Sequence, residues 1–163
     1  MATDFAKVSI SKDIINDIKM MTQRPEFFEQ VVKEAAKIHI ESAKDLTSRA
    51  EDPKGAPFKP LKPTYATQKK SEGFSSEPDL RYQNKSMESM YVAEGAQNRE
   101  ATIRFARGGN YMYEHQRGLS RKPQRKVFAE QQEVNSPPQA QNHKMIEKIL
   151  SEYLNQQRTV KVG

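Results

Sequence analysis

Proline is concentrated in one stretch in the middle of this chain. Five of its nine prolines lie between residues 53 and 78, together with two glycines. Proline has no N–H to donate and biases the preceding residue toward extended geometry, so this stretch can be neither a long helix nor a central strand. It separates the parts of one domain, residues 1–163: a helical front (11–50), an extended Pro-rich arm (51–85), a β-hairpin region with a basic loop (86–134) and a C-terminal helix (136–157).

The front of the chain has apolar residues at helical spacing. Residues 5–10 have an extended pattern, and Ser11 could cap a short helix that reaches Met21. Pro25 suits the first turn of a second helix, which is expected to end near Arg49. Its apolar stripe consists of Phe28, Val32, Ala35, His39, Ala43 and Leu46.

Alternating apolar residues after position 86 predict a β-hairpin. Met90 and Val92 alternate on one run, residues 95–98 supply the turn, and a second run follows from 101 to 105. Gly118 marks another turn, after which a further strand is expected to begin at Val127. A final helix starts at residues 136–138, and its apolar face comprises Ile146, Ile149, Leu150 and Tyr153. The fold class is therefore α+β, with a small antiparallel sheet packed on a long helix, the irregular arm and a C-terminal helix.

The apolar content is small for a chain of this length. Ile, Leu, Val and Phe supply 30 of the 163 residues, while the net charge of +6 is modest. Either part of the chain is irregular, or it hides apolar surface against partner chains. Phe58, Leu61, Tyr65 and Phe74 lie inside the arm, which a plain linker would not need. Burial against partner chains is the interpretation that these residues favour.

Several classes of protein are excluded by composition. No apolar run approaches the roughly 20 residues that a membrane span requires. The N-terminal residues lack the basic start and apolar stretch of a secretory signal. Cysteine is absent, which removes disulfides, thiolate zinc sites and cysteine nucleophiles. We expect a protein made or assembled in a cytoplasm, with no membrane partner.

Positive charge is concentrated between Arg99 and Lys126. This segment has eight basic and two acidic residues, so the rest of the chain is neutral. Two interpretations stay open: a solvated loop, or a surface that meets an acidic partner. Gly108 and Gly109 lie within it, lack the spacing of a phosphate-binding loop and are expected to form a turn.

The densest cluster of chemically active side chains is residues 111–118. A nuclease could use His115 as general acid or base, Arg117 or Arg121 to stabilise phosphate charge, and Tyr113 for orientation. No second acid–base group stands at a fixed spacing, so the alternative is that the aromatic residues anchor a turn. His39 belongs to an apolar stripe, His143 is expected at the surface, and no metal-binding spacing is present. We expect no enzyme activity, no metal and no cofactor.

Four blocks of the sequence resemble the virion morphogenesis family of tailed phages, which comprises tail-completion and neck proteins. The first is residues 55–69, with its Gly-Ala-Pro-Phe-Lys-Pro-Leu start. Residues 80–90 are similar to the second block, and Tyr113, His115, Gln116 and Gly118 are similar to an aromatic-x-His-Gln-x-Gly signature. Residues 121–128 resemble the following Pro-x-Arg-x-Phe block. The resemblance covers about residues 27–155, but the family often has Trp where Phe58 stands.

This resemblance implies a structural subunit of a ring, commonly sixfold, at the phage head–tail junction, with no catalysis. It would give Phe58, Leu61, His115, Gln116, Gly118, Arg125 and Phe128 roles in folding or assembly. The implied partners are further copies of the chain, other neck or tail proteins and, without sequence preference, passing DNA. The implied location is the virion, assembled in the host cytoplasm. Whether the subunit is a tail terminator, a stopper or a completion factor stays open.

The arm and the basic loop are the segments expected to make these contacts. The predicted contact residues are Phe58, Leu61, Tyr65, Phe74, Arg107, Tyr113, His115, Gln116, Arg117, Arg121, Lys122, Arg125 and Lys126. The main alternative is a nucleic-acid-binding protein without sequence specificity, and a small basic ribonuclease is the remaining one.

Overall fold

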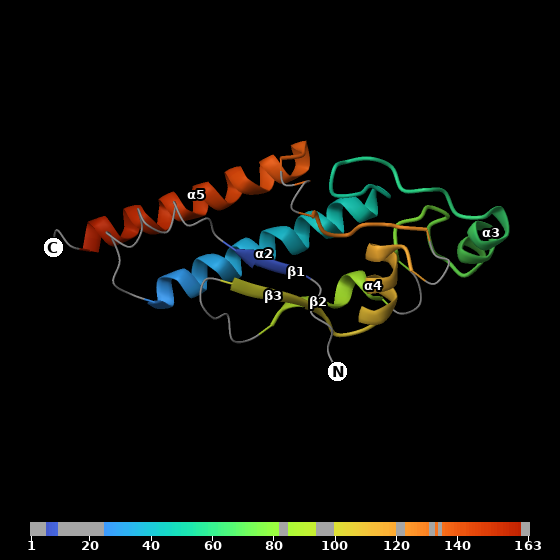
Figure 1. The fold of residues 1–163 in the computed structure, drawn as a ribbon, viewed down its shortest axis with the longest axis horizontal. Coiled ribbons are helices and arrows are strands. Elements are labelled where there is room, and N and C mark those ends of the chain that lie inside the picture. Colours follow the sequence, from blue (N-terminus) through green and yellow to red (C-terminus); the bar gives the residue numbers. More distant parts are fainter. Residues whose placement is uncertain are drawn as a thin grey trace.

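The computed structural model describes residues 6–9, 25–81, 85–93, 100–119, 123–130, 133 and 135–160. These residues form an α+β fold (Figure 1), with two long helices, two short α-helices and a small sheet. The elements are β1 (Ala6–Ser9), α2 (Pro25–Ser48), α3 (Pro63–Ser71), a 3₁₀ turn (Met87–Ser89), β2 (Met90–Val92), β3 (Glu100–Phe105), α4 (Gly109–Arg117) and α5 (Pro137–Val160).

The sheet has three antiparallel strands in the order β1-β3-β2. Met90 pairs with Phe105 and Val92 with Ile103, which confirms the predicted hairpin; its predicted turn lies outside the described residues. Ala101, Ile103 and Phe105 of β3 are buried, whereas the residues between them are half-buried. This alternation places one face of the sheet on the core.

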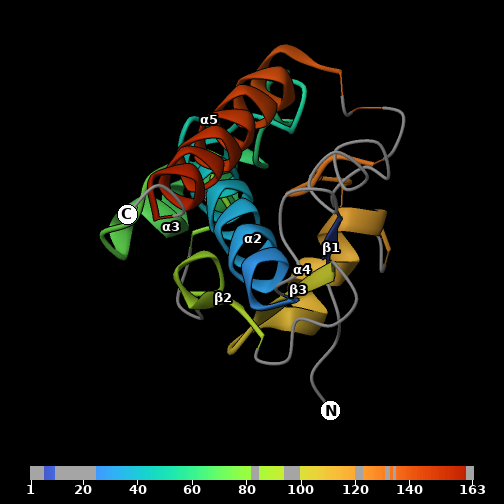
Figure 2. The same cartoon turned by 90° about the vertical axis from the view of Figure 1, so that its left-hand side faces the viewer.

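Helix α2 is the centre of the fold because it is covered on two sides. Figure 2 shows α2 between the sheet and α5. Its residues in the main core cluster are Val32, Ala36, Ile40 and Ala43. Ala35 and Leu46 are also buried, and half-buried His39 lies beside α5 residues Gln139 and Asn142. The predicted helix from Pro25 is confirmed. Its apolar residues do not form the single predicted stripe, because one buried face packs on the sheet and another on α5. The helix expected over residues 11–21 lies outside the described residues.

The contact of α5 with the rest of the chain is more polar than expected. Of its predicted apolar face, only Leu150 is buried, while Gln139 and Asn142 are buried near its start. The Gln139 amide and the Ser136 hydroxyl both donate hydrogen bonds to the carbonyl oxygen of Pro53, at 3.2 and 3.0 Å. The start of α5 is therefore attached to the arm by hydrogen bonds as well as by packing.

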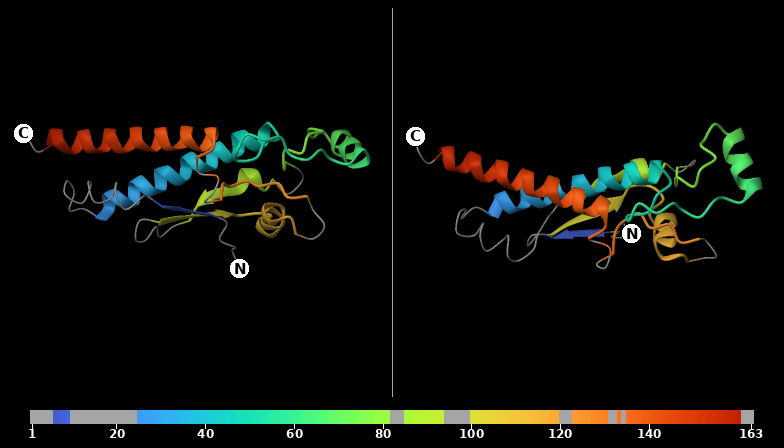
Figure 3. Two further views of the ribbon diagram at one scale, coloured as in Figure 1. Left: turned by 45° about the horizontal axis from the view of Figure 1, so that its top comes forward. Right: turned by 90° about the horizontal axis from the view of Figure 1, so that it is seen from above.

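The arm is not irregular throughout. Pro63 begins the nine-residue helix α3, and Lys62 before it has an extended ψ of 140°. A proline in the first turn removes no helical hydrogen bond, so it can start a short helix as readily as it prevents a long one. Phe58 is buried in the chain's own core instead of lying exposed on the arm. Figure 3 shows α3 at the opposite end of the molecule from the C-terminal end of α5.

Two further expectations were wrong in the basic segment. Gly108 and Gly109 do not form a simple turn, because Gly109 is the first residue of α4. Gly108 and Gly118 flank this helix in left-handed conformations, with φ of +66° and +68°, which glycine adopts readily. Val127 and Phe128 are buried but belong to no strand. None of the described helices combines the length and the apolar character that crossing a membrane requires.

Candidate functional site

The histidine of the Tyr-x-His-Gln-x-Gly segment faces the interior. His115 is 3% exposed, and its Nδ1 donates to the carbonyl oxygen of Pro123 at 3.3 Å. Its ring meets the ring of Tyr111 edge-on, with a centroid separation of 4.6 Å. Of the other members of the proposed nuclease set, Tyr113 and Arg117 are exposed, and Arg121 lies outside the described residues. A substrate that reached those two side chains would therefore find the imidazole buried and already hydrogen-bonded.

Gln116 attaches α4 to the segment 123–128. Its side-chain oxygen accepts hydrogen bonds from the amides of Val127 and Phe128, at 2.7 and 3.2 Å. Its side-chain nitrogen donates to the Phe128 carbonyl oxygen at 3.0 Å. The carboxamide thus binds three backbone groups of this segment in the way that a neighbouring strand would.

Gly118 allows the chain to turn back after α4. A Cβ atom at this position would lie 3.1 Å from the Cβ of Gln124, closer than side-chain packing normally permits. The Arg125 amide donates to the His115 carbonyl oxygen at 2.8 Å, and the Gln124 side chain donates to that of Gln116 at 3.0 Å. The motif residues His115, Gln116 and Gly118 therefore act together to hold one loop against one helix.

Arg125 connects this loop to the arm. Its guanidinium donates from Nη2 to the Lys59 carbonyl oxygen at 3.0 Å, while the side chain is 6% exposed. Burial lowers the pKa of Arg125, and the nearby Tyr111 and Tyr65 partly oppose that shift. Among the described residues no carboxylate forms an ion pair with Arg125, and its Nε is buried without a hydrogen-bond partner. The backbone of the arm at Lys59 is thus joined to the loop through the buried guanidinium of Arg125.

A buried ion pair holds helix α3 of the arm against the segment that follows it. Lys69 of α3 pairs with Asp79, and both side chains are almost completely buried. The Lys69 ammonium also donates to the Glu77 carbonyl oxygen at 2.8 Å, and Asp79 accepts from the Arg81 amide at 3.1 Å. Nothing in the sequence pattern indicated this pair, because nine residues, most of them outside any helix or strand, lie between its members.

Lys126, at the end of the basic segment, is neutralised by neighbouring carboxylates. Lys126 binds Glu133 at 2.9 Å and Glu130 at 3.1 Å, and Lys54 lies 3.2 Å from Glu133. Burial would raise the pKa of Glu133, but hydrogen bonds from the Glu130 amide, Lys126 and Lys54 lower it overall. The hydrogen bond to Glu133 is the main reason that the pKa of Lys126 is raised. These contacts hold Lys126, Glu130 and Glu133 together, so Lys126 is not a free charge on the surface.

The predicted contact residues fall into four groups. Phe58, His115 and Arg125 are buried in the subunit itself. Leu61, Tyr65, Phe74, Gln116 and Lys126 are half-buried. Arg107, Tyr113 and Arg117 are exposed, whereas Arg121 and Lys122 lie outside the described residues. Of the three described groups, only the second and third present surface to a neighbour in this conformation.

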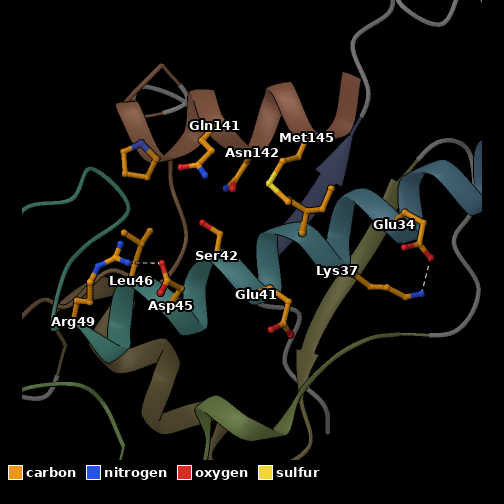
Figure 4. Close-up of a pocket in the computed structure, with 12 residues that line it drawn as sticks. Glu34, Lys37, Glu41, Ser42, Asp45, Leu46, Arg49, Gln141, Asn142 and Met145 are labelled. Carbon is orange, nitrogen blue, oxygen red and sulfur yellow. Dashed lines mark hydrogen bonds and ion pairs between the residues drawn. The ribbon is translucent and has the colours of Figure 1, made fainter. Parts of the chain in front are cut away.

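A groove between α2 and α5 was not expected from the sequence. Figure 4 shows side chains of the two helices facing each other across it. Its volume is about 370 Å³. The lining residues are Glu34, Lys37, Ile38, Glu41, Ser42, Asp45, Leu46, Arg49, Pro138, Gln141, Asn142 and Met145. Met145 is 46% exposed, so the groove offers apolar as well as charged surface.

Within the described residues, no group of His, Asp and Glu side chains comes together in a way that could hold a metal ion. The arrangement around α4 is thus one of hydrogen bonds that order a loop. Among the described residues, the arm, the outer side of α4 and the groove between α2 and α5 offer surface to other molecules.

Comparison with known proteins leaves the family open. The chain matches no family model, no curated protein and no solved structure. The resemblance to phage tail-completion proteins therefore stays a proposal that rests on the four sequence blocks.

The contact between α2 and α5 predicts a pH-dependent stability. Burial, and second the nearby His143, lower the pKa of His39. The unfolded chain then binds a proton near pH 6.5 that the folded chain still excludes, so stability is lost as the pH falls below that value. One such proton changes the free energy of unfolding by at most about 1.4 kcal/mol per pH unit.

Urea unfolding of wild type and His39→Gln between pH 5 and 7.5 measures this effect. The variant should lose less stability on acidification than the wild type. His143→Gln is the matched control, and it should remove only the smaller, electrostatic part. Identical pH profiles for wild type and His39→Gln would contradict the assignment.

Proposed function

We propose that this chain is a structural subunit of the head–tail junction of a long-tailed phage, where it forms a ring with further copies of itself. In this role it is a tail-completion, tail-terminator or neck protein of the virion, assembled in the host cytoplasm, and it binds other neck or tail proteins. Non-specific contact with passing DNA is compatible with this role. Catalysis is not part of the proposal.

The observation that carries the proposal is the arm. Its helix α3 lies at one extremity of the molecule, and most of α3 is exposed (Figure 3). Its Lys69–Asp79 pair orders that end without help from the sheet. A preformed projection of this kind suits a subunit that reaches a neighbour, since closed rings require the same heterologous contact to repeat.

The contacts of the motif residues also support a structural role over a catalytic one. The side chains of His115 and Gln116 form hydrogen bonds to the chain's own loop, and Gly118 leaves room for that loop. A ribonuclease would need the imidazole accessible near the exposed arginines. The low apolar content fits a subunit that completes its burial in an assembly.

Light scattering and negative-stain microscopy of the purified chain test the proposal. We expect closed rings, either of the chain alone or after addition of a tail-tube or connector protein. A monomer under all of these conditions would overturn the proposal. DNA affinity that falls by about 0.9 log units per phosphate contact per log unit of salt, with no rings, would favour a nucleic-acid-binding protein instead. RNA cleavage that His115→Ala abolishes would favour the ribonuclease.

A further inference from the structure

We infer that the arm of one subunit docks into the groove between α2 and α5 of the next subunit in the ring. This inference rests on the proposed function, since it specifies the contact through which the ring closes. The occupant of the groove is a second copy of this chain, and the segment that enters is residues 59–70.

The first argument is the charge of the arm. Residues 59–70 contain four lysines and no acidic residue. Asp79 neutralises Lys69, whereas Lys59, Lys62 and Lys70 are exposed. Three positive charges therefore point outward from a short projection. Half-buried Leu61 and exposed Pro60 and Pro63 lie between them, which gives the same surface an apolar component.

The second argument is the complementary character of the groove. Its α2 wall carries three carboxylates and two cations, and its α5 wall is uncharged. Half-buried Ile38 supplies apolar surface on the α2 wall. Met145, which is 46% exposed, supplies it on the α5 wall (Figure 4). A segment with lysines around Leu61 and two prolines matches such a groove in both charge and apolarity.

The carboxylates of the groove are able to accept new partners. Glu34 and Asp45 pair with Lys37 and Arg49 on the same helix, and Glu41 pairs with Lys44 just outside the groove. These are solvent-exposed pairs three or four residues apart, a type that contributes little stability. The side chains of Glu41 and Asp45 are 73% and 62% exposed, so an incoming lysine can reach them.

The third argument is the placement of the two surfaces. The arm of the same chain contributes no residue to the groove lining, and it is held elsewhere by the Arg125 bond to Lys59. In Figures 1 and 3 helix α3 of the arm lies at one extremity of the molecule. The groove is lined by residues within 34–49 and 138–145 and includes no residue of α3. Contact between two different surfaces is heterologous, and a heterologous contact that repeats around an axis closes a ring.

Cysteine cross-linking tests the contact, and the chain's lack of cysteine leaves no background. Lys62→Cys marks the arm and Met145→Cys marks the groove. Mixing the two single variants under mild oxidation should give the mixed disulfide-linked dimer. A chain with both substitutions should give a ladder of covalent multimers that ends at the ring order. The matched control pairs Lys62→Cys with Tyr91→Cys, because Tyr91 is 41% exposed and lies on β2 outside the groove.

The outcomes separate this inference from the proposed function. Rings by light scattering without the mixed disulfide would overturn arm-to-groove docking and leave the ring proposal standing. Arm-to-arm or groove-to-groove disulfides, or cross-links only to an added tail protein, would also overturn it. A chain that never forms rings would overturn the proposed function itself.

A charge exchange provides a second, independent measurement. Lys62→Glu combined with Lys70→Glu should raise the concentration needed for ring formation at least tenfold, while the circular dichroism spectrum stays unchanged. Adding subunits with Glu34→Lys and Glu41→Lys should restore mixed rings. Unchanged assembly of the first variant would contradict the inference.

Discussion

Asp79→Ala is expected to unfold the end of the arm while the rest of the subunit stays folded. The substitution leaves the Lys69 ammonium, which is 3% exposed, without its counter-charge. Removing one member of a buried ion pair costs about 3–5 kcal/mol because the other charge stays desolvated. The α3 loop can avoid that cost by opening and letting Lys69 reach water. Loss of local order is therefore the expected response.

Hydrogen exchange and limited trypsin digestion measure this opening. Amides of residues 66–73 should exchange faster in the variant, and cleavage should appear at Lys69 or Lys70, while the amides of β3 keep their protection. The control replaces both partners, Lys69→Met with Asp79→Leu, since an apolar pair of similar volume is often neutral or stabilising. Equal protection of α3 in wild type and Asp79→Ala would contradict a structural role for the pair.

Gln116→Leu is expected to destabilise the whole subunit by about 1.5–4.5 kcal/mol. The change removes the three hydrogen bonds that the carboxamide makes to the backbone of residues 127 and 128. Each such bond contributes about 0.5–1.5 kcal/mol net. Val127 and Phe128 belong to the core cluster, so this loop cannot move into water without also losing apolar burial.

Urea unfolding followed by circular dichroism measures that loss as a lower midpoint. Gln124→Leu is the matched control, because the neighbouring glutamine makes one exposed hydrogen bond to the Gln116 carbonyl oxygen. It should cost less than about 1 kcal/mol. Similar losses for the two variants would show that the carboxamide of Gln116 has no special part in holding the loop.

These two variants also affect assembly in different ways. Asp79→Ala should prevent ring formation with little change in the midpoint of global unfolding, because it disorders the projecting segment. Gln116→Leu should weaken both together, because it loosens the core beneath the arm. The arm is joined to the same loop through the bond from Arg125 to Lys59.

The sequence by itself determined the long elements. The spacing from Pro25 to Arg49 predicted α2, and the alternation at residues 90–105 predicted the hairpin, because both patterns are local and repeat over several residues. The start of α5 followed from Ser136 and the two prolines after it. The α+β class followed from these elements.

Only the tertiary structure decided the short helices and the fate of the polar residues. Helices α3 and α4 have nine residues each, too few for a periodic signal, and their ends depend on Pro63, Gly108 and Gly118. Whether Phe58 lies in the core or on the arm depended on the path of the backbone around it. The residue types of His115 and Gln116 do not by themselves show whether they belong to an active site or hold a loop in place. Their role was decided by which backbone groups of residues 123–128 came within hydrogen-bonding distance, and that is a property of the folded chain.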